Sequence, residues 1–443
     1  MKLSAFGEKL TARSGILQLM DDLGKPLPPG VPSYQLGGGN PARIPGVEKA
    51  YRREMERILS HEDDFENAIA RYDAPQGRIS FIENIATYLS KTYGWKVKPE
   101  NVAITNGSQS AFFYLFNLFS GTFSLSDEKG NPDVTGGRPK YTKTILFPLM
   151  PEYIGYADQG IQRDTFVSVP SRCEEYPDHT FKYFIDFPLL EEYLSDHGEV
   201  GAMCVSRPTN PSGNVLTDEE IHRLSALAGQ YHIPLFVDNA YGLPFPNIVF
   251  TEDAAPLWDE NIVLSMSLSK IGLPSIRTGI VIAKPQIISA IANINAIVAL
   301  ASGSLGQVLA EEMIKTGELV ELGEKEVKPF YQEKSKEMQD WIHQYFEGTH
   351  YAIHKSEGSI FTWLYLKDLS IPTIELYHIL KEQGVITVPG EYFFFGHEDQ
   401  KNGLPYPHPH YNKCLRLNYS RPAEEVREGV KIIAETYKKY AQK

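Results

Sequence analysis

The sequence predicts an α/β protein in which a mostly parallel sheet is flanked by helices and a smaller α+β domain follows. Three observations support this prediction. From about residue 78, short apolar runs alternate with segments of helical pattern, which is typical of parallel strands joined by helices. After about residue 306 the pattern changes to long, charged helical stretches. The chain has 443 residues, 42% of them hydrophobic, which is enough for one large core or two domains.

Within the large domain, helical and extended segments alternate in a regular series. Helices are predicted at residues 78–93 and 108–119, and a third helix opens at Thr217, where Glu220 completes a capping box. The stretch 120–143 is rich in Gly, Ser, Asp and Pro, which indicates a surface excursion between elements. The apolar runs are predicted to be buried strands at 102–105, 144–147, 202–206, 233–237 and 262–266.

The C-terminal part is predicted to form the smaller domain. Charged helical patterns cover residues 306 to about 347 and 422–440, and the largely apolar run at 359–366 is typical of a strand. We place an N-terminal segment that packs with the small domain at 1–49, the large domain at 50–305 and the small domain at 306–443.

Composition narrows the class of protein. The formal net charge of −13 argues against nucleic acid or an anionic membrane as the main partner. The three cysteines lie far apart with no CxxC motif, so neither a disulfide framework nor a zinc site is indicated. The first ten residues lack an apolar signal core, and no apolar run is long enough to span a bilayer. We therefore expect a soluble cytoplasmic protein.

Three charged side chains follow two of the predicted strands. The apolar run at 233–237 leads to Asp238. The run at 262–266 leads to Lys270, and Arg277 comes seven residues later. An acid, an amine and a guanidinium at the ends of buried strands are what pyridoxal 5'-phosphate needs, because the amine binds the cofactor covalently, the acid pairs with its pyridinium nitrogen and the guanidinium meets its phosphate.

Each member of this set also has an ordinary interpretation. Most lysines are solvated surface charges, and a lone acid at a strand end is more often a helix cap or a metal ligand. The apolar strand that leads into Lys270 would nevertheless carry its stem into the interior, where desolvation lowers the pKa of the amine. Tyr241, three residues after Asp238, would donate to the phenolic oxygen of the cofactor, although packing is the usual role of one tyrosine among 25.

A turn between a strand and a helix supplies a candidate phosphate site. Gly107, Ser108 and Gln109 lie at this turn, where glycine permits close approach and the first helical N–H groups can hold a phosphate. By itself the motif is only a turn with a good cap. Ser267 would add another phosphate contact.

Four residues are candidates for contacts with the cofactor ring or the substrate. Tyr153 is the candidate to stack on the pyridine ring, and Tyr156 is the competing choice. Asn210 lies in a loop after a strand, where Asn is common in any case, and its amide would reach the cofactor and a substrate carboxylate. Arg416 is flanked by apolar residues on an apparent strand and needs an anionic partner. That partner is either a substrate α-carboxylate, which matches it in a bidentate way, or a structural ion pair.

The pair His408 and His410 invites a metal interpretation. No acid or cysteine lies near them at the spacing of metal ligands. We therefore interpret them as part of a surface loop and expect no metal ion in the protein.

The order of these motifs resembles that of the class I and II aminotransferases, which are pyridoxal-phosphate-dependent enzymes of fold type I. The resemblance spans nearly the whole chain, from Gly39-Asn-Pro through Tyr72 and Gly77 to Arg416. It implies a large cofactor-binding domain, a smaller α+β domain and a homodimer with shared active sites. It also implies that Tyr72 reaches the phosphate of the neighbouring subunit, that Gly39 lies beside the substrate, and that Arg416 and Asn210 hold the substrate carboxylate.

Longer strings narrow the resemblance to the branch of this group that moves the amino group of L-valine to pyruvate, giving 3-methyl-2-oxobutanoate and L-alanine. In that branch Lys270 would be the general base, with Asp238 and Tyr241 as further catalytic groups. The strings lie at residues 36–42, 106–119, 151–158 and 238–246.

Other functions stay open on the sequence. An apolar pocket separates valine from similar side chains by only about 1–3 kcal/mol per methylene, so alanine, leucine, isoleucine and 2-aminobutyrate remain open as donors. The same scaffold hosts lyases and synthases, which the motifs do not exclude. A cofactor-binding transcription regulator would need a DNA-binding module before the Gly39 motif, for which we expect no room.

Overall fold

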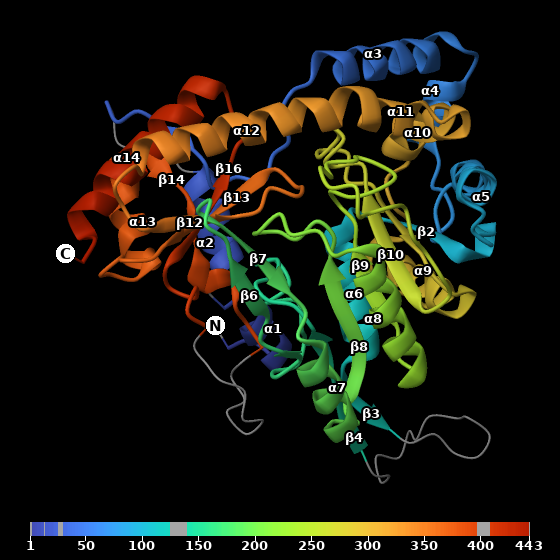
Figure 1. The fold of residues 1–443 in the computed structure, drawn as a ribbon. Coiled ribbons are helices and arrows are strands. Elements are labelled where there is room, and N and C mark those ends of the chain that lie inside the picture. Colours follow the sequence, from blue (N-terminus) through green and yellow to red (C-terminus); the bar gives the residue numbers. More distant parts are fainter. Residues whose placement is uncertain (1, 13, 25–29, 125–139, 397–407, 443) are drawn as a thin grey trace.

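The computed structural model describes residues 2–12, 14–24, 30–124, 140–396 and 408–442, and most of its strands belong to two sheets (Figure 1). The strands are β1 Tyr34–Gln35, β2 Val102–Thr105, β3 Gly121–Ser124, β4 Lys140–Phe147, β5 Phe166–Ser168, β6 Arg172–Glu175, β7 Thr180–Phe184, β8 Val200–Ser206, β9 Leu235–Asp238, β10 Ile262–Ser267, β11 Gly279–Ile282, β12 Tyr351–His354, β13 Phe361–Leu366, β14 Val385–Ile386, β15 Val388–Pro389 and β16 Cys414–Asn418.

The helices lie on both sides of these sheets. The α-helices are α1 Ala5–Leu10, α2 Gly15–Gly24, α3 Pro45–Ser60, α4 Asp64–Ala70, α5 Ile79–Tyr93, α6 Ser108–Phe119, α7 Phe187–Asp196, α8 Asp218–Gln230, α9 Pro285–Ala299, α10 Ser304–Thr316, α11 Glu318–Leu322, α12 Lys328–Tyr345, α13 Thr373–Glu382 and α14 Ala423–Tyr440. None of the helices in the described ranges is both long and apolar enough to cross a membrane.

The larger sheet has the strand order β2-β11-β10-β9-β8-β4-β3, and β5 pairs with β4. The pairs β8–β9, β9–β10, β4–β8 and β4–β5 are parallel, whereas β11 runs antiparallel to both of its neighbours. The predicted α/β fold with a mostly parallel sheet is therefore confirmed. Strands β2, β8, β9 and β10 share one direction, so the residues that follow them meet at one edge of the sheet.

The elements predicted for the large domain are present with small shifts. Helix α5 begins at Ile79, and α6 has the predicted bounds. At α8 the capping box is formed in both directions, because Glu220 N–H donates to Thr217 Oγ1 at 3.2 Å and Thr217 N–H donates to Glu220 Oε2 at 2.8 Å. The described ends of the predicted excursion, β3 and the start of β4, pair with each other. Its residues 125–139 lie outside the described part of the chain.

The second sheet has the order β15-β16-β13-β12-β7-β6 and joins two distant parts of the sequence. Strand β7 comes from the middle of the chain and pairs in parallel with β12. The sequence analysis predicted neither β6 nor β7. Strand β6 is polar and partly exposed and has no apolar run. The predicted domain boundaries stay a prediction, and this pairing shows that residues 172–184 contribute to the sheet of the C-terminal part.

The charged region predicted to be helical at 306–347 forms several helices. Helix α10 ends at Thr316 and is capped by Gly317, which has a left-handed φ of 84°, and a π-helical turn at Gly323–Val327 separates α11 from α12. Helix α12 packs against α14 and runs across the top of the molecule from α11 toward α13 (Figure 1). It also contacts β13 and therefore packs within the C-terminal part.

Candidate active site

A cavity of about 330 Å³ lies at the carboxyl edge of the larger sheet. Of the predicted site residues, those that line it are Gly39, Ser108, Gln109, Tyr153, Asn210, Asp238, Tyr241, Ser267, Lys270, Arg277 and Arg416. Gly107 lies at its edge against Arg277. Tyr72 is not part of the wall and is 84% exposed. The sheet topology thus brings together nearly all of the side chains singled out from the sequence.

Lys270 lies in a turn three residues beyond the end of β10, rather than on the strand end itself. Its ammonium donates to the carbonyl oxygen of Gly39 at 2.6 Å and lies 5.4 Å from the centroid of the Tyr241 ring. Burial, together with the positive charges of Arg416 and Arg277, lowers the pKa of Lys270 to about 8. A fraction of this amine is therefore neutral near physiological pH, as a nucleophile or general base requires.

Asp238 is the last residue of β9, and both of its carboxylate oxygens accept hydrogen bonds. Tyr156 O–H donates to Oδ2 at 2.5 Å, and Ala240 N–H donates to Oδ1 at 3.0 Å. Burial raises the pKa of Asp238, while these donors and Lys270 oppose the rise. The Tyr156 hydroxyl is therefore committed to Asp238. Tyr153, the other candidate for stacking on the cofactor ring, packs edge to face against Tyr156, with the ring centroids 5.1 Å apart. It is Tyr156, and not Tyr153, whose hydroxyl is bound to Asp238.

The turn before α6 and the segment before β11 approach closely enough to exclude side chains. Gly107 has φ of +80°, and a Cβ there would lie 2.1 Å from Nη2 of Arg277. Arg277 itself has φ of +49°, a left-handed conformation that residues other than glycine rarely adopt and that is concentrated at functional sites. Its Nη1 donates to Ser269 Oγ at 3.3 Å. Backbone and guanidinium donors thus gather at the N-terminus of a helix, which is a favourable place for an anion.

Arg416 lies on β16 and is only 2% exposed. Its Nη1 donates to Asn210 Oδ1 at 2.8 Å, its Nη2 donates to the carbonyl of Gly37 at 2.5 Å, and its buried Nε has no hydrogen-bond partner among the described residues. The guanidinium lies 4.1 Å from the centroid of the Phe361 ring. Burial lowers its pKa to about 10, so it remains charged at neutral pH. No carboxylate of the described ranges forms an ion pair with it, so the structural ion pair considered for Arg416 is not found there.

The glycine-rich segment 36–40 connects Lys270 to Arg416. Its five consecutive carbonyl groups each accept a hydrogen bond from a different atom. In chain order from residue 36, the donors are Asn418 N at 2.7 Å, Arg416 Nη2 at 2.5 Å, Asn418 Nδ2 at 2.5 Å, Lys270 Nζ at 2.6 Å and Ser420 Oγ at 2.7 Å. The segment is therefore held between the strand that carries Arg416 and the turn that carries Lys270.

Sequence reasoning missed one wall of the cavity. Ile16, Leu19 and Met20 of α2 line it, together with Ile154 from the loop after β4. The spacing of the first three residues, at i, i+3 and i+4, is that of one face of a helix and could have indicated an apolar surface. It would not have indicated which cavity that surface covers.

Glu152 is a second buried acid that the sequence did not reveal. It is 0% exposed, and its carboxylate accepts from Ser206 N at 2.8 Å, Ser206 Oγ at 2.6 Å and Tyr153 N at 3.0 Å. Burial raises the pKa of Glu152 to about 8, although the hydrogen bonds from Ser206 and Tyr153 oppose the rise. A glutamate in a Pro-Glu-Tyr loop carries no sequence signal of burial, so only the tertiary contacts show it.

The prediction of a surface loop at His408 and His410 is wrong for His410. That side chain is 4% exposed, and its Nδ1 lies 2.6 Å from the hydroxyl of Tyr183. Burial lowers its pKa well below the ordinary value. The aromatic rings of the second sheet surround it, and sequence spacing could not show this. Among the described residues, no group of three or more His, Cys, Asp or Glu side chains is arranged to hold a metal ion.

The chain belongs to the family described as aminotransferase class I and II, whose sequence profile matches residues 155–433. Enzymes of this family depend on pyridoxal phosphate. The chain is 48% identical to the valine–pyruvate aminotransferase of Escherichia coli K12 over 98% of both chains.

Two solved structures are similar in fold over almost the whole chain. The crystal structure of the valine–pyruvate aminotransferase of Salmonella typhimurium LT2 has a TM-score of 0.82 and 45% identity, covering 96% of this chain and 99% of that one. A protein from Psychrobacter arcticum 273-4 has a TM-score of 0.91 and 41% identity, covering 99% of each chain. The expected aminotransferase of fold type I is therefore confirmed.

Proposed function

We propose that this enzyme transfers the amino group of L-valine to pyruvate through pyridoxal 5'-phosphate, giving 3-methyl-2-oxobutanoate and L-alanine. The observation that carries the proposal is the presence, in one cavity, of a half-buried Lys270 with a lowered pKa and a buried Arg416 that has no acidic partner among the described residues. The high identity to an enzyme named for valine and pyruvate, over 98% of both chains, supports this choice of substrates.

The residues of the cavity fit the cofactor. Lys270, Arg277 and Arg416 form no ion pair with any described carboxylate, so the cavity offers positive charge to anionic groups. Gly107 lets the Arg277 guanidinium approach the turn closely, since a Cβ there would lie 2.1 Å from Nη2. We assign the phosphate to Gly107, Ser108, Gln109, Ser267 and Arg277, the pyridine nitrogen to Asp238, the phenolic oxygen to Tyr241 and Asn210, and the ring face to Tyr153.

The chemistry of the site follows from these assignments. The bound cofactor supplies an electron sink that stabilises the negative charge left when the substrate loses its α-proton. Lys270 would take this proton, and its lowered pKa suits a base that works near neutral pH. Arg416 and Asn210 would hold the α-carboxylate beside Gly39. Valine and pyruvate both carry this carboxylate, so one clamp serves both halves of a ping-pong transfer.

The apolar wall favours an aliphatic side chain. Ile16, Leu19 and Ile154 line the cavity and carry no hydrogen-bonding group in their side chains. A branched aliphatic chain would bury its surface there, which contributes about 0.8 kcal/mol per methylene.

The test is a comparison of substrates with the purified enzyme. Valine with pyruvate should give alanine and 3-methyl-2-oxobutanoate in equal amounts, and the kcat/KM for valine should exceed that for leucine, isoleucine and 2-aminobutyrate. Release of ammonia without alanine would identify a lyase instead. A tenfold preference for another amino donor would replace valine in the proposal.

We further propose a cytoplasmic homodimer in which Tyr72 reaches the phosphate in the partner's site. Tyr72, Ile79 and Ile297 are 84%, 66% and 86% exposed, an unusual degree for such large side chains. The segments that carry them adjoin, because Asn295 Nδ2 donates to the carbonyl of Pro75 at 2.8 Å. The chain after α9 also reaches the phosphate turn, since Gly303 N–H donates to Asn106 Oδ1 at 3.4 Å.

Light scattering should give twice the mass of the chain. Mixing Lys270→Ala with Tyr72→Ala protein under conditions that exchange subunits should recover activity, because about a quarter of the sites would be wild type in both residues. Failure of the mixture to exceed the sum of its components would contradict the shared site.

A further inference from the structure

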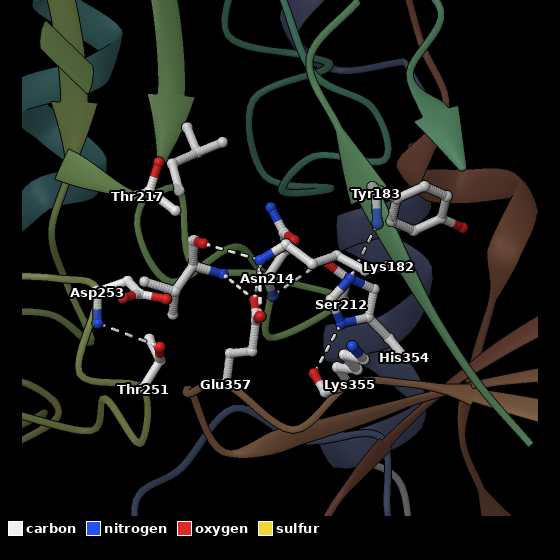
Figure 2. Close-up of polar contacts among 12 residues, drawn as sticks. Lys182, Tyr183, Ser212, Asn214, Thr217, Thr251, Asp253, His354, Lys355 and Glu357 are labelled. Atoms are coloured by element: carbon white, nitrogen blue, oxygen red, sulfur yellow. Dashed lines mark hydrogen bonds and ion pairs between the residues drawn. The ribbon is translucent and has the colours of Figure 1, made fainter. Parts of the chain in front are cut away.

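A buried ion pair lies outside the cavity, where three segments of the chain meet (Figure 2). Lys182 enters from β7, and Glu357 comes from the turn before β13. The ammonium of Lys182 lies 2.6 Å from both carboxylate oxygens, and the two side chains are 9% and 16% exposed. A pair this shielded from water is held more firmly than an exposed one.

The third segment is the loop that carries Asn210. Lys182 Nζ donates to the carbonyl of Val215 at 3.2 Å, and Val215 N–H donates to Glu357 Oε2 at 3.0 Å. Val215 ends a tight loop that is closed by the bond from Thr209 N–H to the carbonyl of Asn214 at 2.8 Å. Both partners of the ion pair are therefore hydrogen-bonded to the backbone of Val215, at the end of this loop.

The loop does not anchor itself through Asn214. That side chain is fully buried, and neither its amide nitrogen nor its amide oxygen has a hydrogen-bond partner in the described part of the chain. Figure 2 shows it beside the ion pair of Lys182 and Glu357. The position of the loop thus depends on the bonds to Val215 and on close packing, since a Cβ on Gly213 would lie 2.7 Å from the carbonyl oxygen of Gly358.

Glu357 is also connected to Arg416, the second residue that we assign to the substrate carboxylate. Strand β13 begins four residues later, and its Trp363 stands opposite Arg416 in the sheet register. The hydrogen bond from Arg416 Nη1 to Asn210 Oδ1 joins this strand to the loop that carries Asn210. Short, well-bonded segments therefore connect the ion pair to both Asn210 and Arg416.

We propose that Lys182 and Glu357 are positioning residues that set the separation of Asn210 and Arg416 and so tune the binding of the substrate carboxylate. This inference rests on the proposed function, because it assigns those two residues to the substrate. Neither Lys182 nor Glu357 lines the cavity, so their effect is exerted through the loop at 209–215.

The experiment compares Lys182→Met with wild-type holoenzyme. The KM for valine and the Kd for 3-methyl-2-oxobutanoate, measured by calorimetry, should each rise about tenfold, because a small displacement of a positioned group weakens its contacts. The kcat should change less than about threefold, as expected when binding is lost equally in ground and transition states. The affinity for pyridoxal phosphate should stay unchanged, and Lys182→Arg should restore most of the substrate affinity.

The matched control is Lys367→Met, which removes a lysine–glutamate pair with Glu175 next to the same sheet. It should leave KM and Kd as in wild type. Equal shifts in both variants, or unchanged substrate affinity in Lys182→Met, would overturn the proposal. If Lys182→Met does not fold, Glu357→Gln is measured in the same way, since it retains an acceptor for Val215 N–H. A wild-type enzyme that binds the oxo acid but does not transaminate valine would count against the proposed function alone.

Discussion

The two ends of the cavity are built in different ways. At the cofactor end, Asp238 ends one strand of the larger sheet, and Gly107 and Lys270 follow two others within three residues. At the substrate end, Arg416 bonds to the carbonyl of Gly37, which is 379 residues away in sequence. The first end is a set of local motifs on a common edge, whereas the second is a set of distant segments tied by hydrogen bonds.

The two ends therefore differ in how easily their residues can be recognised from the sequence. A strand that ends in a functional residue can be recognised by its apolar run, because parallel strands deliver their carboxyl ends to one edge. A clamp between distant segments has no such local pattern. We therefore expect substitutions at the cofactor end to act on chemistry and cofactor affinity, and substitutions at the substrate end to act on KM and specificity.

The largest effect should come from Lys270→Ala. Removal of the general base should lower kcat for valine by about 10⁴-fold, the upper range for general acid–base catalysis. The spectrum of bound cofactor should persist in a changed form, because the phosphate contacts remain. Lys91→Ala, on the exposed face of α5, is the control and should retain wild-type kcat. A Lys270→Ala enzyme with wild-type turnover would refute the assignment.

Next in size should be Arg416→Lys. Lysine lacks the planar fork and cannot keep the bonds to Asn210 and Gly37 while it binds a carboxylate. The kcat/KM for both valine and pyruvate should fall about 10³-fold, with unchanged affinity for pyridoxal phosphate. Steady-state kinetics and cofactor titration measure the two quantities. A loss confined to cofactor affinity would place Arg416 at the wrong end of the cavity.

Gly107→Ala should have the opposite effect, weakening the binding of the cofactor rather than that of the substrate. The added Cβ would collide with the Arg277 guanidinium and strain a backbone at φ of +80°. The Kd for pyridoxal phosphate should rise about a hundredfold, corresponding to about 3 kcal/mol, whereas the KM for valine at saturating cofactor should change little. Gly94→Ala is the matched control, since Gly94 has φ of +69° but no atom near its added Cβ. If both variants weaken cofactor binding equally, close approach is not the cause.

Acid should weaken the second sheet through its buried histidines. Burial lowers the pKa of His354 on β12 to about 3, and its Nδ1 is bound to the carbonyl of Lys355 at 2.8 Å. The unfolded chain binds this proton near pH 6.5, so stability is full above that pH and is lost as the pH falls toward 3. The contribution at pH 5 should be about 2 kcal/mol lower than at pH 7.5.

Urea unfolding at the two pH values measures this loss, and His354→Gln should reduce it. His408 and His410 shift in the same direction, so part of the slope should remain in that variant. A stability that is independent of pH between 7.5 and 5 would contradict the buried neutral state.

The smallest effect should come from Leu19→Ala in α2. Loss of apolar surface at the cavity wall should lower kcat/KM for valine about tenfold and leave that for alanine nearly unchanged. The ratio of the two constants is the measurement, with Leu17→Ala as control, because Leu17 lies on the same helix and is 48% exposed. An unchanged ratio would show that α2 does not contact the substrate side chain.

Much of the fold and of the cofactor end could be predicted because their signals are local. The buried strands β2, β8, β9 and β10 have apolar runs, and the start of α8 is marked in the sequence by a capping box. Strand β6 was not predicted because it is partly exposed and its sequence, Arg-Cys-Glu-Glu, is polar. His410 was misassigned because its burial comes from aromatic residues far away in the chain.

The sequence alone determined the class of chemistry. The residue types and their spacing after apolar strands specified an amine, an acid and a phosphate turn, because short-range patterning decides which strand ends carry them. Tertiary structure alone decided the commitment of Tyr156 to Asp238, the buried Glu152, the apolar wall from α2 and the ion pair behind Asn210. Those features depend on distances between segments that are remote in sequence, and only the folded packing of the two sheets establishes such distances.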